Sequence, residues 1–136
     1  MPVNLLSTSQ RWEGRVIENP SMIRWKGKLY LFYSGNEHLS ADYAVGYAVC
    51  ASPTTPCVKH GRNPILKSRG SQLGPGGASA FIDHMGQLRI AFHWWNAPYT
   101  SYPAYPECER TRTCTTQGQR RIAVEPVYEG RNGLEV

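Results

Sequence analysis

Glu18 is the residue of this sequence whose type and setting best suit acid–base chemistry. It stands between Ile17 and the pair Asn19-Pro20. The proline lacks a backbone donor and is expected to hold the preceding residue extended, so the local chain is restrained. A carboxylic acid restrained beside apolar neighbours can donate a proton near neutral pH. Glu18 is therefore the candidate general acid; the alternative is a solvent-exposed glutamate at the start of a strand.

A histidine among aromatic residues forms the second candidate group, because His93 lies next to Phe92 and is followed by two tryptophans. A neutral imidazole can ligate a metal ion, although a histidine in such a run can equally be a hydrogen-bonded structural residue. Aromatic rings complement the apolar C–H faces of sugars, and the same rings also fill cores. The candidate substrate-binding residues are Tyr33, Ser34, Trp94 and Trp95.

The four cysteines form two close pairs, Cys50 with Cys57 and Cys108 with Cys114. Zinc sites prefer shorter spacings with partner His or Cys residues, so two local disulfides are the better interpretation. Disulfides persist in oxidising compartments, which predicts an extracellular or periplasmic protein. Residues 1–10 lack a charged start and an adequate apolar stretch, so we identify no signal peptide in this chain.

Size and charge exclude several classes of protein. With 136 residues, the chain fits one domain with its own core. Its 15 Lys and Arg residues exceed its 10 Asp and Glu residues, but they are scattered, whereas nucleic-acid binding predicts a concentrated stripe. The apolar runs are too short to span a bilayer. We therefore expect no nucleic-acid partner and no membrane partner.

The elements that must position Glu18 and His93 are strands. Glycine, proline and aromatic residues are plentiful, and no segment has helical periodicity over a useful length. The predicted strands cover residues 20–25, 28–34, 43–50, 78–83, 87–93 and 121–127, with a weaker one at 64–67. The Gly-rich segment 74–79 precedes a strand rather than a helix, which favours a tight loop over a phosphate-binding loop.

A shift of 59 residues superposes two parts of the chain without gaps. The superposed pairs are Met22/Phe81, Ile23/Ile82, Gly27/Gly86, Leu29/Leu88, Leu31/Ile90 and Tyr33/Phe92. Such a repeat of short strands is typical of a β-propeller, and chance similarity between two hairpins is the alternative. We predict one all-β domain over residues 1–136, a partial propeller of antiparallel four-stranded blades, with units at about 17–70 and 76–130. Glu18 and His93 would then face one central funnel.

Several motifs, in order along the chain, resemble glycoside hydrolase family 43. They lie at residues 12–14, 17–22, 27–36, 43–48, 74–77, 92–95 and 118–124. The resemblance implies a five-bladed β-propeller, of which this chain would hold about two to two-and-a-half blades from the C-terminal part. It also implies cleavage of arabinose- and xylose-containing polysaccharides with inversion.

By resemblance, Glu18 corresponds to the general acid of the family, and His93 to a histidine that helps hold a central metal ion, often calcium. The family's general base and the residue that tunes the acid are aspartates from sequence N-terminal to the matched part, so neither has a counterpart here. Inverting hydrolysis needs two carboxyl groups, roughly 6.5–9.5 Å apart.

Three hypotheses follow for the whole chain. A half-propeller exposes blade faces and strand edges, so we expect self-association, as a symmetric homodimer or higher homo-oligomer that brings two copies of Glu18 towards one channel. The alternatives are a non-catalytic carbohydrate-binding or structural module and an incomplete product without an independent role.

Overall fold

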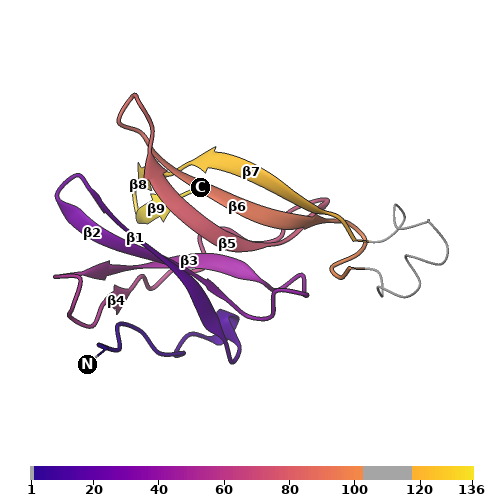
Figure 1. Ribbon diagram of the computed structural model, residues 1–136, viewed down its shortest axis with the longest axis horizontal. Coiled ribbons are helices and arrows are strands. Elements are labelled where there is room, and N and C mark those ends of the chain that lie inside the picture. Colours follow the sequence, from indigo (N-terminus) through magenta and orange to yellow (C-terminus); the bar gives the residue numbers. More distant parts are fainter. Residues whose placement is uncertain (1, 103–117) are drawn as a thin grey trace.

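The described part of the chain is built almost wholly from strands (Figure 1). The computed structural model describes residues 2–102 and 118–136. Apart from the 3-10 turn η1 (Arg11–Glu13), the regular elements of these residues are strands that pair antiparallel. This confirms the predicted all-β class. None of the described residues form a helix long and apolar enough to cross a membrane.

Four strands form the first sheet, in the order of the sequence. They are β1 (Ile17–Trp25), β2 (Lys28–Gly35), β3 (Ala44–Cys50) and β4 (Val58–Lys59). The turn between β1 and β2 consists of Lys26 and Gly27, whose φ angles of 47° and 79° are both positive, as a tight two-residue hairpin turn requires. All of β2 after Lys28 is buried, which explains why its sequence is a nearly continuous apolar run.

Three of the described strands form the second sheet, and a short hairpin follows it. The sheet consists of β5 (Gln72–Ile82), β6 (Leu88–Asn96) and β7 (Arg120–Pro126), and the hairpin of β8 (Tyr128–Gly130) and β9 (Gly133–Glu135). In this hairpin the Leu134 amide donates to Tyr47 Oη at 3.1 Å, and Glu129 forms an ion pair with Lys26. The hairpin therefore ties the end of the chain to the first sheet.

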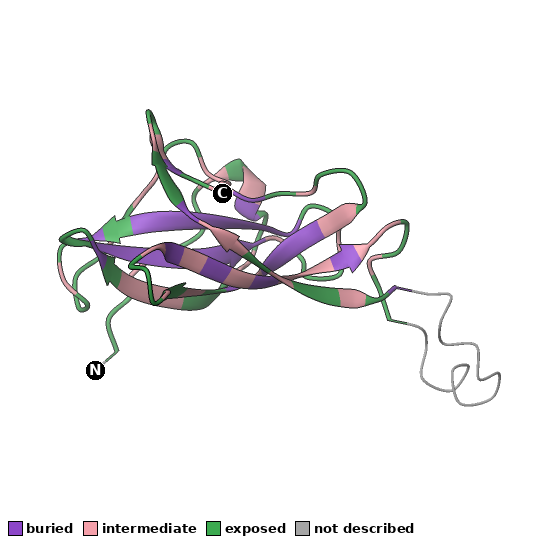
Figure 2. Cartoon of the chain, turned by 90° about the horizontal axis from the view of Figure 1, so that it is seen from above, coloured by how far each residue is buried: buried purple, intermediate pink, exposed green. Residues whose placement is uncertain are grey.

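The main core joins the two sheets (Figure 2). Tyr30 and Phe32 of β2 belong to the same buried cluster as Leu88, Ile90 and Phe92 of β6. Burying these side chains removes apolar surface from water, which is the largest favourable contribution to folding. The sheets thus stack face to face, as consecutive blades do.

The opposite face of β2 packs against the N-terminal segment of the chain. Leu29 and Leu31 form a second cluster with Leu5 and Leu6. The 59-residue shift makes Leu29 and Leu31 equivalent to residues of β6 that pack against the first sheet. Equivalent strands therefore turn equivalent faces in the same direction, as a repeat around an axis requires.

Two hydrogen bonds join residues that are 59 positions apart. Asn19 Nδ2 donates to the Ala78 carbonyl at 3.1 Å, and the Ala80 amide donates to Ser21 Oγ at 2.9 Å. Strands β1 and β5 therefore lie side by side, and positions that the 59-residue shift makes equivalent lie opposite one another. This supports the predicted repeat.

The ungapped superposition fails at one point, the register of the hairpins. Ile23 pairs with Tyr30, whereas the equivalent Ile82 pairs with Leu88 rather than with Arg89. The two registers differ because the first hairpin has a two-residue turn and the second has a longer turn over residues 83–87.

The Gly-rich segment 74–79 is part of strand β5 and not the tight loop that the sequence suggested. Register shifts interrupt the pairing between Leu73 and Gly76 and again between Gly76 and Ser79. A Cβ atom at Gly74 would lie 2.2 Å from the carbonyl oxygen of Ser40. The glycines therefore mark bulges and a close backbone approach within a strand.

The fourth strand of the first sheet is β4, whereas the sequence predicted residues 64–67. Those residues provide an isolated bridge between Leu66 and Val45 instead. The disulfide between Cys50 and Cys57 closes the connection from β3 to β4, which confirms the first predicted cysteine pair. Cys108 and Cys114 lie outside the described residues.

Replacing Cys50 and Cys57 by serine is expected to lower the free energy of unfolding by roughly 2–3 kcal/mol, because the open loop gains conformational freedom in the unfolded chain. The bridged residues are seven positions apart. Urea denaturation of the oxidised wild type and of the double variant measures the difference. Equal free energies of unfolding would show that the disulfide does not stabilise the fold.

Candidate functional site

Glu18 and His93 line the same shallow cavity, of about 310 Å³. It lies where β1, β5, β6 and β7 meet the loop after β2. We call it the Glu18 site, and its lining residues are Glu18, Asn19, His38, Tyr43, Gly77, His93 and Arg120. A carboxylate, a phenol, two imidazoles and a guanidinium thus converge on one polar pocket.

Glu18 is exposed and is held by a hydroxyl group. Its Oε1 accepts a hydrogen bond from Tyr43 Oη at 2.6 Å. The expected enclosure by apolar neighbours is therefore absent in the single chain. The sequence also predicted an extended conformation for the residue before Pro20. This prediction is wrong, because Asn19 has a φ of 52°. A register shift between Glu18 and Ser21 follows, and such a bulge redirects the side chain beside it.

Tyr43 is the best-fixed side chain of the site, with 1% of its surface exposed. Its ring is stacked on His93, with centroids 5.9 Å apart and planes at 13°. A Cβ atom at Gly76 would lie 1.9 Å from Tyr43 Cε1, so the glycine makes room for the ring. Burial, together with the bond to Glu18, raises the pKa of Tyr43 to about 12. The phenol therefore stays protonated and remains a donor at physiological pH.

His93 is half-buried in β6. Burial, with the nearby Arg120 and His38, lowers the pKa of His93, although Glu18 acts in the opposite direction. A Cβ atom at Gly77, whose φ is 64°, would lie 2.5 Å from His93 Nε2. Gly77 therefore makes room for the imidazole of His93, as Gly76 does for the ring of Tyr43. Nδ1 of His93 is buried and has no hydrogen-bond partner among the described residues.

Stability is expected to fall as the pH decreases below 6.5, the ordinary pKa of histidine. In that range the unfolded chain binds a proton at His93 that the folded chain binds less well, so acid favours unfolding. His93→Gln should show a smaller loss. Urea denaturation of both proteins from about pH 5 to 8 compares the two slopes. Identical slopes would contradict a lowered pKa of His93 in the folded chain.

A metal ion at His93, calcium by resemblance, remains a prediction. Calcium takes six to eight oxygen ligands. Glu18 is the one carboxylate among the described lining residues, and Arg120 adds a positive charge beside His93. Residues 2–102 and 118–136 contain no group of three His, Cys, Asp or Glu side chains that could hold a metal. These residues do not fit a calcium cage, so we assign no chemical step to a metal.

Arg120 is a site residue that the sequence analysis missed. Its guanidinium group lies over the ring of Trp95, 4.7 Å from the centroid. Its Nε and Nη2 atoms are buried and lack an acceptor within the part of the chain that the structure describes. The residue also lines the Glu18 site, where a guanidinium group can donate to a polar ligand. In the sequence, Arg120 and Arg121 look like ordinary surface charge, since nothing local indicates that one of them turns inward.

Two of the predicted substrate-binding residues, Tyr33 and Trp95, lie in the interior. They are 2% and 0% exposed. Tyr33 Oη donates to Glu13 at 2.8 Å, and Trp95 Nε1 donates to the carbonyl of His38 at 2.9 Å. Neither ring has a free face for a sugar in this chain, so burial corrects the expectation that they stack on substrate.

The other two predicted residues, Ser34 and Trp94, border the site or the core. Ser34 is fully buried, and its Oγ accepts a hydrogen bond from the Gly77 amide at 2.9 Å. It therefore joins the two sheets behind the Glu18 site rather than facing a ligand. Trp94 is half-buried, packs against the main core and lies near the guanidinium group of Arg121.

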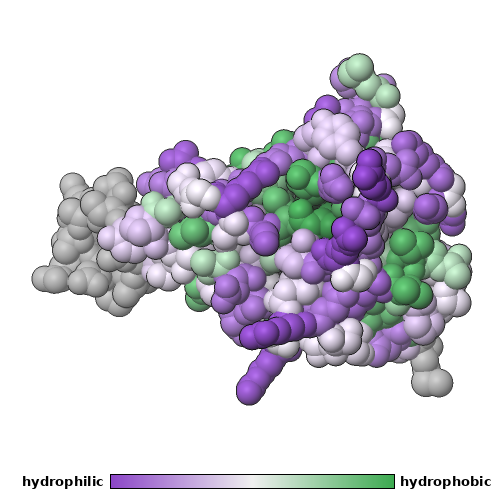
Figure 3. All heavy atoms as spheres, turned by 180° about the vertical axis from the view of Figure 1, so that it is seen from behind, coloured by the Kyte–Doolittle hydropathy of each residue, from purple (hydrophilic) through white to green (hydrophobic). Residues whose placement is uncertain are grey.

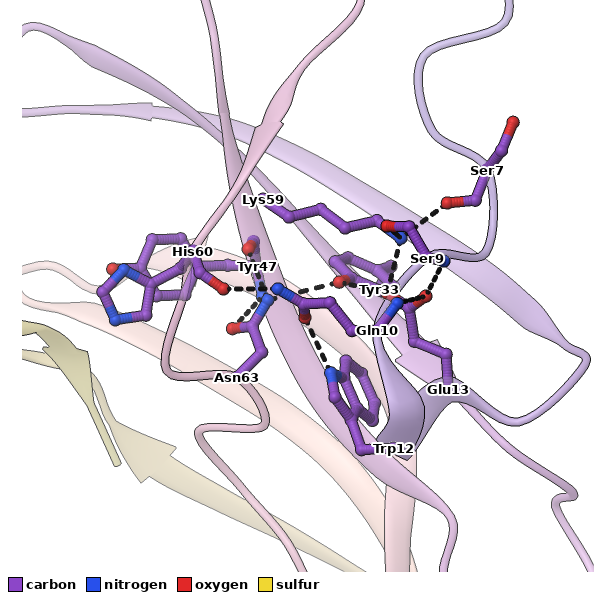
Figure 4. Close-up of polar contacts among 10 residues, drawn as sticks. All are labelled: Ser7, Ser9, Gln10, Trp12, Glu13, Tyr33, Tyr47, Lys59, His60 and Asn63. Atoms are coloured by element: carbon purple, nitrogen blue, oxygen red, sulfur yellow. Dashed lines mark hydrogen bonds and ion pairs between the residues drawn. The ribbon is translucent and has the colours of Figure 1, made fainter.

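A second polar cluster, formed by Glu13, Lys59, Tyr33 and Asn63, anchors the N-terminal segment on the first sheet (Figure 4). Glu13 is 0% exposed and accepts from Lys59 Nζ at 2.6 Å and from Tyr33 Oη at 2.8 Å. Burial alone would raise the pKa of Glu13, but these bonds, with those from the backbone amides of Ser9 and Gln10, hold it below its usual value. The carboxylate is satisfied within the chain, so we regard the cluster as structural.

A larger cavity, of about 880 Å³, lies beside this cluster. Gln10, Trp12 and Asn63 line it. The Gln10 amide already bonds to the His60 carbonyl and to Trp12 Nε1, and the Asn63 amide already bonds to Tyr33 and Tyr47. Arg11, Asp42 and Lys67 also line this cavity, but its described lining contains no tyrosine or histidine, so the hydroxyl-bound carboxylate of the Glu18 site has no counterpart there.

The folded chain is similar to several solved structures. One is a thermostable family-43 glycoside hydrolase, with 30% identity, a TM-score of 0.72, and coverage of 96% of this chain and 40% of that chain. Another is an endo-1,4-beta-xylanase from Bacteroides thetaiotaomicron VPI-5482, with 26% identity, a TM-score of 0.72, and coverage of 96% and 41%. An alpha-L-arabinofuranosidase from Lactobacillus brevis, 24% identical, shares the fold with a TM-score of 0.71 over 96% and 40% of the two chains.

This chain therefore spans about two fifths of the length of these three proteins. The similarity of fold confirms the predicted partial propeller. No curated protein matches the sequence significantly. The sequence does match the family described as Glycosyl hydrolases family 43, over residues 2–120. Since that match covers most of the 136 residues, the chain belongs to glycosyl hydrolase family 43.

Proposed function

We propose that this chain is a glycosidase-like module that binds and cleaves polysaccharides containing arabinose or xylose, with Glu18 as the general acid. The observation that carries the proposal is the 2.6 Å hydrogen bond from Tyr43 to Glu18, which holds a carboxyl group in an open polar cavity. The names of the similar structures, a xylanase and an arabinofuranosidase, support this substrate class. Arg120 and His93 line the same cavity beside Glu18, and side chains of these types can form hydrogen bonds with sugar hydroxyls.

Cleavage with inversion requires a second carboxylate, roughly 6.5–9.5 Å from the first. Among the described residues that line the cavity, Glu18 is the one carboxylate. The general base would therefore come from outside this cavity wall. In our proposal a second copy of the chain supplies it, in a homodimer.

The outer face of the second sheet is the surface that self-association would cover. Phe81, Val124 and Ile122 are exposed there, Ile122 by 83%. Val124 pairs with Ala91 and Ile122 pairs with His93, and paired residues point to the same face of a sheet. This face therefore continues into the Glu18 site. Apolar side chains also gather among polar ones on the side of the molecule shown in Figure 3. Exposed apolar faces of this kind favour association, and a symmetric pair would cover both copies.

The test combines three measurements on the wild-type chain: sedimentation, calorimetry with arabino- and xylo-oligosaccharides, and chromatography of the products. We expect a dimer that binds one of these sugar classes and releases shorter products. A stable monomer would contradict the assembly, and the absence of binding to both sugar classes would contradict the substrate class.

A non-catalytic carbohydrate-binding module is the second candidate. It is favoured by the single carboxylate in the described lining of the cavity. Binding of the same oligosaccharides without any product would identify this function in place of cleavage.

An oxidising location, extracellular or periplasmic, is part of the same proposal. The disulfide between Cys50 and Cys57 supports it, because such bonds persist in oxidising compartments. Polysaccharides that contain arabinose or xylose would be encountered there.

A further inference from the structure

The two oxygen atoms of Glu18 are not equivalent, because Tyr43 binds one of them. Tyr43 Oη donates to Oε1 at 2.6 Å. Since Glu18 is exposed, its side chain would otherwise be free to rotate at the edge of the cavity. A carboxyl oxygen that accepts a short hydrogen bond from a hydroxyl is the less favourable place for the carboxyl proton.

Tyr43 can impose this orientation because its own ring cannot move. The ring is buried, is stacked on His93 at 5.9 Å, and lies where any side chain at Gly76 would collide with it. The hydroxyl is equally reliable as a donor, since burial raises the pKa of Tyr43 to about 12. The position and the protonation state of this donor are therefore both fixed by the fold.

We propose that Tyr43 is a positioning residue that holds Glu18 through Oε1 and reserves Oε2 for the proton that is given to the substrate. This inference rests on the proposed function of Glu18 as general acid. When the glycosidic C–O bond breaks, its electron pair goes to the leaving oxygen, which takes the proton from Oε2. The attacking water forms the new bond from its oxygen to the anomeric carbon and gives its proton to a second carboxylate. Tyr43 keeps its own proton and stabilises the carboxylate left on Glu18.

Tyr43→Phe is the variant that tests the inference, because it keeps the ring between Gly76 and His93 and removes only the hydroxyl group. Glu18 should lose its single side-chain orientation. NMR relaxation and coupling constants of the Glu18 methylene groups report this directly and need no turnover. We expect one rotamer in the wild type and averaging in Tyr43→Phe. A single rotamer in both proteins would overturn the inference.

Turnover supplies the second measurement. Losing one hydrogen bond to a charged group should lower kcat roughly ten- to a hundred-fold and leave KM nearly unchanged. Tyr43→Phe should have no further effect in a Glu18→Gln background, because it acts through Glu18. An equal loss in both backgrounds would overturn the positioning role. If the wild type shows no turnover, the catalytic part of the proposed function fails, and the rotamer measurement still decides the inference.

Tyr47→Phe is the matched control. Tyr47 is also buried, lies four residues further along the chain, and uses its hydroxyl to accept a bond from the Leu134 amide. We expect this variant to keep the Glu18 rotamer and the wild-type kcat. A change in either would show that the effects at Tyr43 come from general loosening of the sheet.

Discussion

Lys59→Met is expected to lower the free energy of unfolding by about 3–5 kcal/mol, the largest loss of stability that we expect from any single substitution in this chain. The ammonium group lies 2.6 Å from Glu13 Oε1, and its side chain is 9% exposed. It also donates to the Ser7 carbonyl at 2.6 Å and to Ser9 Oγ at 3.1 Å. Methionine fills a similar volume but leaves the fully buried Glu13 carboxylate without its counter-charge.

The loss should depend on pH in a defined direction. The bonds from Lys59 and its neighbours hold the pKa of Glu13 below its ordinary value of 4.5. The stabilisation is therefore present above that pH and is lost as the pH falls through the lowered pKa. Urea denaturation curves of the wild type and of Lys59→Met should accordingly converge in acid.

Lys26→Met is the matched control for this prediction. Lys26 forms an ion pair with Glu129 at 2.8 Å, but both side chains are well exposed. Exposed pairs contribute about 0–1 kcal/mol, so this variant should unfold nearly as the wild type does. Equal losses for Lys59→Met and Lys26→Met would contradict the structural role that we assign to the buried cluster.

Glu18→Gln is expected to lower the rate of oligosaccharide cleavage by about 10²- to 10⁴-fold, the usual contribution of a general acid. Glutamine keeps the size of the side chain and can still accept a bond from Tyr43, but it cannot donate a carboxyl proton. Binding of the same oligosaccharides, measured by calorimetry, should change far less than the rate. Such a result would show that the substitution weakens stabilisation of the transition state rather than binding of the substrate.

Glu37→Gln makes the same change of charge in the loop after β2, outside the lining of the cavity. We expect it to keep the wild-type rate. A Glu18→Gln variant as active as Glu37→Gln would rule out the assigned role of Glu18.

Local patterns in the sequence predicted most of the strands, because the apolar and polar residues of each strand reflect how far that strand is buried. Strand β2 is an apolar run bounded by turn residues, and its burial is nearly continuous. The spacing of Cys50 and Cys57 likewise predicted a local disulfide, since a short loop brings the two residues together. The 59-residue repeat brought Glu18 and His93 to one site, because equivalent ends of neighbouring blades lie together.

The residues that surround Glu18 could not be predicted in this way, since their roles depend on contacts across the fold. Tyr43 lies just before β3, and only the path of β5 past its ring makes it a neighbour of His93. The sequence cannot separate an aromatic residue of the core from one that lines a site, which explains why Tyr33 was predicted to bind substrate and Tyr43 was not. Glu13 looks like a surface residue because its partner Lys59 lies 46 positions away.

The most direct test of the account is a titration of the ¹⁵N-labelled wild-type chain with arabino- and xylo-oligosaccharides, followed by NMR. The account predicts that one sugar class shifts the amide signals of the Glu18 site, with the largest changes at Asn19, Gly77 and Arg120. Saturating concentrations of both sugars that shift no signals, or that shift only those around Gln10 and Trp12 at the other cavity, would contradict it.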